Sequence, residues 1–164
     1  MLKFLNIKNI VLIENLSIDF EDGLTVLTGE TGAGKSILLD ALGLTLGSRA
    51  DFSLIRHGET KATVSAVFSL NIGHSVWELL EPVGIEKNLE LILRRHLTHD
   101  GKSTATINDI PVSINLLRKC GDILVEIQGQ FEGRGLLDKN NHILLLDKYA
   151  NHNEELIKLK NVWN

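Results

Sequence analysis

A glycine-rich stretch near the N-terminus, Val26 to Leu39 (VLTGETGAGKSILL), constrains the fold of this chain more than any other feature. Residues 29–36 match the pattern G-x-x-x-x-G-K-S in full, and an apolar segment precedes them. The apolar residues that follow are spaced as on one face of a helix. A strand, a glycine loop and a helix in this order predict a nucleotide-phosphate site in an α/β fold. The alternative is a strand-to-helix turn without a ligand.

Each position of this loop has a physical reason. Glycines allow the backbone to turn and to approach phosphate oxygens without a Cβ clash. Successive backbone N–H groups and the helix N-terminus then attract the anion. Lys35 would contact the terminal phosphates, and the Ser36 hydroxyl would bind Mg²⁺. The predicted phosphate-binding residues are Gly29, Glu30, Thr31, Gly32, Ala33, Gly34, Lys35 and Ser36.

The loop alone does not complete a hydrolytic site. Phosphoryl transfer also needs a metal-binding carboxylate, usually at the end of an apolar strand, and a group that orients water. The segment ILVEIQ has only three apolar residues before Glu126, and ILLLDKY places Asp147 at the start of a helical pattern. Neither supplies a convincing carboxylate.

Composition excludes several classes of protein. The chain has 164 residues, enough for one domain with a core, and a formal net charge of −4, which gives no global support to nucleic-acid binding. The single cysteine, Cys120, rules out an internal disulfide framework, suits a reducing cytosol and is expected to be a buried side chain. No apolar run reaches about 18 residues, so we expect no membrane span. No small-residue cleavage site follows the apolar N-terminal segment, so we expect no signal peptide.

Periodicity and turn residues predict alternating strands and helices. Asp22-Gly23 and Asp100-Gly101 indicate turns, Ser113 a helix N-cap and Gly47 a helix end. Strands are expected at residues 2–10, 16–20, 24–29, 62–70, 90–97, 103–109 and 122–128, and helices at 34–46, 74–84 and 113–121.

The end of the chain has a different pattern. Apolar residues and one histidine recur at heptad-like spacing. They are Leu145, Tyr149, His152, Leu156, Leu159 and Trp163. This spacing predicts either the start of a coiled coil or an ordinary amphipathic helix.

Four segments, taken in order, resemble the N-terminal part of the RecN family, bacterial DNA double-strand-break repair proteins of the SMC-like branch of ABC ATPases. They are GETGAGKSILLDALGLTLGSRAD, LIRHG, LILRRHLTHDGKSTATINDIPV and LVEIQGQFE. The resemblance extends from Met1 to about Asp147. It implies an α/β P-loop NTPase fold of the ABC/SMC head type, with a mixed β-sheet and flanking helices, leading into the start of a coiled coil.

In that family the head is split by a long coiled coil, and a C-terminal lobe carries the acidic strand. The resemblance therefore implies that residues 1–139 form the N-terminal half of the head. Residues 140–164 would begin the coiled-coil helix. Implied partners are ATP, Mg²⁺, the missing lobe, a coiled-coil partner helix and, for the complete protein, DNA and a second head in a homodimer. A cytoplasmic, nucleoid-associated location follows from the same resemblance.

The resemblance also assigns roles to residues outside the loop. Gln130 falls where the family's glutamine contacts Mg²⁺ and the attacking water. The family's pattern there is rich in histidine, whereas this chain reads QGQFEG, so Gln128 is a competing candidate. Arg49 and Arg56 fall where SMC-like heads carry arginines near nucleotide or DNA, but they would equally suit a solvated surface.

Two smaller clusters have simple interpretations. His96, His99 and Asp100 could suggest a metal site, but residues three apart on a strand face opposite sides, which favours surface positions. Arg94, Arg95 and Lys102 could form a small basic patch for DNA phosphates, although a solvated hairpin is the preferred interpretation.

The sequence thus supports an ATP-binding half-head that hydrolyses ATP only with its missing lobe and a second head. The alternative from another class is a non-catalytic fragment or interaction module with vestigial nucleotide binding. A self-contained P-loop kinase or GTPase is disfavoured, because no guanine-reading motif or arginine-rich lid is recognisable.

Overall fold

The computed structural model describes residues 1–28, 34–127, 143, 146–147, 149–150 and 152–163. The chain divides into two units, Met1–Val125 and Glu126–Asn164, which are treated separately. The strands of the first unit are β1 (Leu2–Ile10), β2 (Ile13–Asp19), β3 (Lys61–Ser69), β4 (Glu90–Thr98), β5 (Ser103–Ile107) and β6 (Ile110–Val112). Its helices are α1 (Lys35–Thr45), η1 (Phe52–Leu54), α2 (Val76–Leu80), η2 (Glu81–Val83) and α3 (Ile114–Leu124).

The strands form one sheet in the order β2-β1-β3-β4-β5-β6, and every neighbouring pair is antiparallel. The expected α/β class is confirmed, but the expected mixed sheet is not, because the described strands contain no parallel pair. The predicted turn at Asp100-Gly101 joins β4 to β5, with Gly101 at φ 82°. Asn108 and Asp109 form a second two-residue turn with positive φ before β6. The strand expected to continue to Asp109 therefore ends at Ile107.

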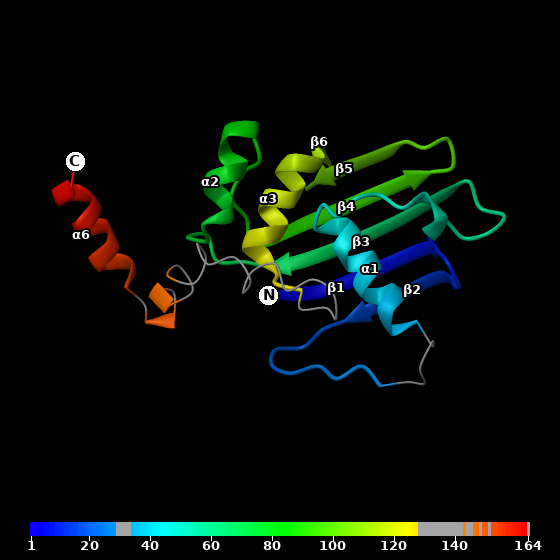
Figure 1. Ribbon diagram of the computed structural model, residues 1–164, viewed down its shortest axis with the longest axis horizontal. Coiled ribbons are helices and arrows are strands. Elements are labelled where there is room, and N and C mark those ends of the chain that lie inside the picture. The colour runs from blue at the N-terminus through cyan, green and yellow to red at the C-terminus, as the bar shows by residue number, and fades with distance from the viewer. Residues whose placement is uncertain (29–33, 128–142, 144–145, 148, 151, 164) are drawn as a thin grey trace. The chain divides into compact units, whose positions relative to one another are not determined.

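The core lies between one face of the sheet and helices that include α1 and α3, and α2 contributes Val76, Trp77 and Leu80. Figure 1 shows α1 and α3 lying across the strands, where α1 contacts β1, β3 and β4 and α3 contacts β5. Alternate residues of the strands point to this face, as the period of a strand requires. The largest fully buried side chains are Trp77, Phe68, Ile7, Ile10, Leu80, Ile85, Leu91, Leu93, Leu97, Ile107, Leu117 and Val64.

Two predicted strands are wrong in the described residues. Residues 24–28 are not in a strand, and Leu24 and Val26 are 92% and 69% exposed. The second wrongly predicted strand, residues 122–128, belongs in part to α3, which continues to Leu124 rather than ending at Gly121. A short apolar run fits a buried strand or a buried helix equally well, and α3 buries its own apolar face here. A strand also needs a neighbouring strand to pair with, and no described strand pairs with residues 24–28 or with residues 122–127.

The second unit contains α6 (Asn153–Trp163). Leu159 and Trp163 of the predicted seam are 67% and 88% exposed, and Leu156 is half-buried. Ala150 and His152 lie in turns before α6 begins. Leu145 and the predicted domain boundary at residue 139 lie outside the described residues, so the coiled coil stays a prediction.

Candidate phosphate-binding site

The described part of the predicted phosphate loop begins at Gly34. Gly34 has φ 95° and ψ 0° and is the N-cap of α1, and its carbonyl oxygen accepts from the Leu38 N–H at 3.1 Å. Only glycine adopts this left-handed backbone without strain, which explains the residue at this point of the motif. Gly29, Glu30, Thr31, Gly32 and Ala33 lie outside the described residues.

The N-terminus of α1 is suited electrostatically to an anion. No side chain caps this end of α1 with a hydrogen bond, and its first turn carries no acidic residue. The backbone N–H groups of a first helical turn have no partner within the helix, and the helix dipole places partial positive charge there. Lys35 and Ser36 are the first two residues of α1, half-buried and exposed respectively. This end therefore combines N–H donors, an ammonium group and a hydroxyl.

The opposite end of α1 is held against α3 by two glycines. A Cβ added to Gly47, which has φ 85°, would lie 2.6 Å from both Cα and N of Arg118. A Cβ added to Gly121 would lie 2.5 Å from the carbonyl oxygen of Leu46. Arg118 Nε also donates to the Gly47 carbonyl oxygen at 3.2 Å. The predicted helix end at Gly47 is confirmed, and this contact positions the phosphate-loop helix against α3.

The helix α3 leads toward the predicted glutamine loop. Its N-cap is confirmed, because Ser113 Oγ accepts from the Leu116 N–H at 3.2 Å. Gln128 and Gln130 lie outside the described residues, so the glutamine loop stays a prediction.

The two arginines assigned by resemblance have different surroundings. Arg56 is held, since its Nη1 donates to the Leu12 carbonyl oxygen at 2.8 Å and its Nη2 lies 3.9 Å from a Glu14 carboxylate oxygen. Arg49 is exposed in the loop after α1, at a surface hollow lined by residues 49–53. The loop keeps its shape because Asp51 Oδ1 accepts from both the N–H and the hydroxyl of Ser53. Arg56 therefore braces the β1–β2 turn, and Arg49 is the one open to solvent.

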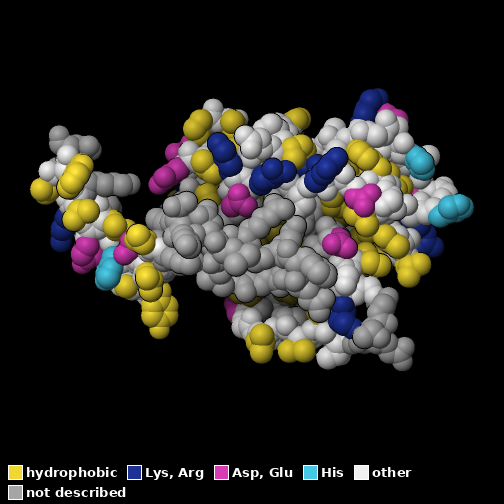
Figure 2. Space-filling model, in the orientation of Figure 1, with side chains coloured by type: hydrophobic (Ala, Val, Ile, Leu, Met, Phe, Trp, Pro, Cys, Tyr) yellow, Lys and Arg dark blue, Asp and Glu magenta, His cyan; other side chains and the backbone are white. Residues whose placement is uncertain are grey.

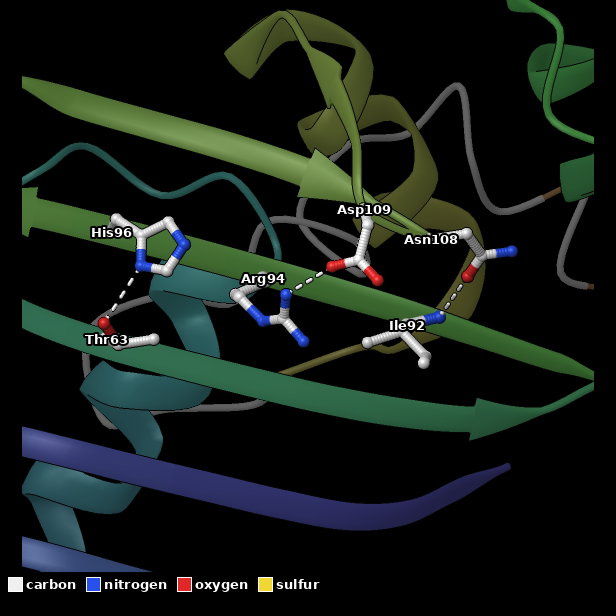
Figure 3. A network of polar contacts seen from close by, with 6 residues as sticks. All are labelled: Thr63, Ile92, Arg94, His96, Asn108 and Asp109. Carbon is white, nitrogen blue, oxygen red and sulfur yellow. Dashed lines mark hydrogen bonds and ion pairs between the residues drawn. The ribbon is translucent and has the colours of Figure 1, made fainter.

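The basic patch considered for the hairpin is not formed as a single surface. Arg94 points away from the helices and pairs with Asp109, as Figure 3 shows. Arg95 points to the opposite face of β4 and is 2% exposed. Lys102 pairs with Asp100 at 2.8 Å at the hairpin turn. Neighbouring residues on a strand face opposite sides, so Arg94 and Arg95 cannot serve one ligand together.

The possible metal cluster at the same hairpin is also not formed. His96 Nδ1 lies 2.9 Å from the Thr63 hydroxyl on the outer face of the sheet (Figure 3). Hydrogen bonds from Lys102 and Thr98 lower the pKa of Asp100 to about 2. Within the described ranges no group of three or more histidine, cysteine or acidic residues could hold a metal ion. His99 and Asp100 are exposed, and His96 is half-buried.

Two further features concern thiol reactivity and membrane insertion. Cys120 is fully buried in α3, and burial raises the pKa of its thiol to about 11, which argues against a nucleophile, as predicted. No helix in the described part of the chain is long and apolar enough to cross a membrane.

Sequence reasoning missed the burial of Arg95 and the contact of Arg118 with Gly47. Sequence alternation places Arg95 among the inward-facing residues of the strand, next to Leu93 and Leu97, and that signal was available. Arg118 lies at Gly47 because the end of α1 packs closely on α3, and such a tertiary contact has no signal in the local sequence.

Comparisons with known proteins agree with this architecture. A family model for an AAA domain matches residues 5–161. The DNA repair protein RecN of Bacillus subtilis (strain 168) is 45% identical over 151 residues, and that of Halalkalibacterium halodurans is 46% identical over 151 residues. Both alignments cover 92% of this chain, which spans only 26% and 27% of those relatives. The SMC head domain from Thermotoga maritima is 26% identical, with a TM-score of 0.55 over 72% of this chain and 41% of that chain.

Proposed function

This chain belongs to the AAA domain family, and on that premise we propose that it is the ATP-binding N-terminal lobe of an SMC-like ATPase head that acts in DNA double-strand-break repair. The observation that carries the proposal is the start of α1. An uncapped helix N-terminus without acidic residues follows directly on a left-handed Gly34 and begins with Lys35 and Ser36. This set of donors suits the phosphates of a nucleotide and its Mg²⁺.

In the proposed site, residues 29–34 wrap the phosphates with backbone N–H groups. Lys35 would neutralise charge on the terminal phosphates, and the Ser36 hydroxyl together with Gln130 would hold Mg²⁺. Mg²⁺ would withdraw charge from the phosphate oxygens when bound. Gln130 would also orient water. The base is not read by this loop, so the preference for ATP rests on the relatives.

The site is proposed to be incomplete in this chain. Residues 1–139 would form one half of the head and residues 140–164 the start of a coiled-coil helix. Exposed apolar residues beside the phosphate loop support this, because Leu24, Val26 and Leu27 are 92%, 69% and 46% exposed and Leu39 of α1 is 47% exposed. Apolar surface of this kind typically marks a binding interface. A C-terminal lobe would cover it and bring the missing carboxylate, and hydrolysis would then require a second head.

The complete protein is proposed to bind DNA and to form a homodimer through its heads. We place it in the bacterial cytoplasm, at the nucleoid during repair. These properties rest on the relatives, of which this chain spans about a quarter.

The experiment is equilibrium binding of a fluorescent ATP analogue with Mg²⁺, together with an ATPase assay. We expect binding that Lys35→Ala abolishes, without turnover by the isolated chain. ATP hydrolysis by the isolated chain that is lost in Lys35→Ala would refute the proposal that the site is incomplete.

A second candidate is an interaction module with vestigial nucleotide binding. The observation that favours it is the exposed apolar side of α6, where Leu159 and Trp163 meet solvent. A folded sample that does not bind nucleotide at about millimolar concentration has a binding free energy weaker than about −4 kcal/mol. That result would favour this alternative.

A further inference from the structure

The outer face of the sheet, opposite α1 and α3, carries polar side chains over five strands. These side chains alternate along β1 to β5 with apolar residues, and each is exposed or half-buried. We call them the polar patch, and its members are Asn6, Lys8, Asn15, Ser17, Lys61, Thr63, Ser65, Arg94, His96, Thr98, Thr104 and Thr106.

The sheet register places three basic residues around Thr63. Lys8 of β1 is its partner on one side, and His96 of β4 is its partner on the other. His96 Nδ1 lies 2.9 Å from the Thr63 hydroxyl, so the two side chains meet on this face (Figure 3). Lys61 precedes Thr63 by two residues and is therefore a diagonal neighbour of Lys8 and His96, at about 7–8 Å. The three basic residues thus share a surface about 10 Å wide, which is two strand spacings.

The charges of Lys8 and Lys61 are not balanced by neighbouring carboxylates. Among the ion pairs of the described residues, none includes either lysine. Glu90 is on the same face, but it is six residues from His96 along β4, about 20 Å away. Burial, and then the charges of Lys61 and Arg94, lower the pKa of His96. The patch is therefore locally positive on a chain whose formal net charge is −4.

Acidic residues nearer to the patch are already engaged. Asp109 pairs with Arg94, and Asp100 pairs with Lys102. Glu59, two residues before the start of β3, accepts a hydrogen bond from a buried asparagine side chain at 2.9 Å. The excess positive charge therefore comes from the two exposed lysines.

The chemistry of the polar patch suits phosphate groups better than a protein surface. Lysine, serine, threonine and asparagine side chains are usual donors to DNA phosphates. The centre of a protein interface is instead rich in aromatic and apolar residues. The apolar residues Phe4, Val67 and Ile92 of this face form one row of the register, outside the patch. Because the basic residues are spread over an open surface, they suit an extended polyanion better than a single small anion.

We propose that the polar patch docks the phosphate backbone of a DNA duplex, with Lys8 and Lys61 contacting phosphates and the neighbouring hydroxyl and amide groups donating further hydrogen bonds. One strand of a duplex carries a phosphate for about every 3.4 Å of its axis, so lysines about 7–8 Å apart reach phosphates about two steps apart. Backbone contacts do not read the bases, so binding is independent of sequence. The site rests on the DNA binding proposed above for the complete protein, but it uses no residue of the phosphate loop.

The test is fluorescence anisotropy of a labelled DNA duplex of about 20 base pairs, titrated with this chain at salt concentrations from about 25 to about 150 mM. Lys8→Gln and Lys61→Gln should each weaken binding about tenfold at about 50 mM salt. Each should also reduce the slope of log K against log salt by about 1, and the double variant by about 2. Duplexes of different sequence should give the same values.

Lys119→Gln is the matched control, because Lys119 is an exposed lysine on α3, which packs on the inner face. It removes the same charge and should leave the salt slope nearly unchanged. No DNA binding at about 25 mM salt, an unchanged slope in the double variant, or an equal loss in Lys119→Gln would each overturn the site. Lys8 and Lys61 are exposed, so their variants should keep the fold, which circular dichroism checks.

Two further readouts locate the DNA. Phosphates close to His96 favour its protonated form, so the pKa of His96, followed by NMR, should rise when the duplex binds. An unchanged pKa with DNA bound would contradict docking at the patch. Lys35→Ala should lose nucleotide binding and keep DNA binding, whereas Lys8→Gln should keep Mg-ATP binding. Failure of the DNA site is therefore distinguishable from failure of the phosphate loop.

Discussion

The Gly47 carbonyl oxygen accepts a hydrogen bond from Arg118 Nε at 3.2 Å, and at the same point the two backbones are too close for a side chain at position 47. This contact ties α1, which carries the predicted phosphate-binding residues Lys35 and Ser36, to α3, which precedes the predicted glutamine loop. Both helices also pack on the same sheet (Figure 1). Contacts at the C-terminal end of α1 therefore help to orient its N-terminus, where the predicted phosphate-binding residues lie.

Replacement of Gly47 should therefore destabilise the first unit. Gly47→Ala places a Cβ 2.6 Å from the Arg118 backbone at φ 85°, and we expect a loss of at least about 2 kcal/mol in the free energy of unfolding. Chemical denaturation measures it. Gly73→Ala is the control, because Gly73 has open space around a Cβ and no positive φ. Equal effects of the two substitutions would contradict the close contact.

Loss of the α3 cap should have a smaller effect. Ser113→Ala removes the hydroxyl that accepts from the Leu116 N–H, and we expect about 1 kcal/mol of destabilisation. Ser113→Asp retains an acceptor and should restore most of the free energy of unfolding. A stable Ser113→Ala variant would show that the cap hydrogen bond contributes little.

Trp77 should report on folding of the first unit. It is 1% exposed, and its Nε1 donates to the Asn71 carbonyl oxygen at 3.0 Å, whereas Trp163 is 88% exposed. Trp77→Ala should lower the free energy of unfolding by about 3–5 kcal/mol, the usual cost for a buried aromatic residue. Trp163→Ala, measured by the same denaturation, should change it little. Blue-shifted fluorescence that persists in Trp77→Phe would contradict the burial.

His96 should make stability depend on pH. Burial, then the charges of Lys61 and Arg94, lower its pKa from the ordinary 6.5, so the unfolded chain binds this proton more readily than the folded protein. The free energy of unfolding should therefore decrease as pH falls below about 6.5 and be unaffected by His96 above it. His96→Gln should reduce the loss between about pH 7.5 and about pH 5.5. If the pH dependence of stability is unchanged in His96→Gln, His96 is not its source.

Side-chain patterning and turn chemistry were sufficient to predict β1, β3, β4, β5, α1 and the N-cap of α3. The failures share one physical cause. Residues 24–28 and the region after Leu124 have strand-like sequences, but a strand exists only with a neighbour, and no described strand pairs with them. Propensity alone does not show whether a neighbour is available.

The residues of the candidate site were also only partly predictable from local sequence. The motif predicts the start of α1 because Gly34 adopts the left-handed backbone conformation at the N-cap, which is a local property of glycine. Arg118 lies against the end of α1 through close packing that depends on Gly47 and Gly121, from distant parts of the sequence. Figure 2 shows Lys and Arg side chains spread over the face that carries α2 and α3, whereas Arg95 is buried, so surface charge alone does not reveal Arg95.

The most direct test of the central claim is calorimetric titration of the folded chain with Mg-ATP, in parallel with Lys35→Ala. The account predicts saturable binding of one nucleotide, loss of that binding in Lys35→Ala without loss of fold, and no release of phosphate by the chain alone. Absence of binding in a folded sample, or binding of equal affinity in Lys35→Ala, would contradict it.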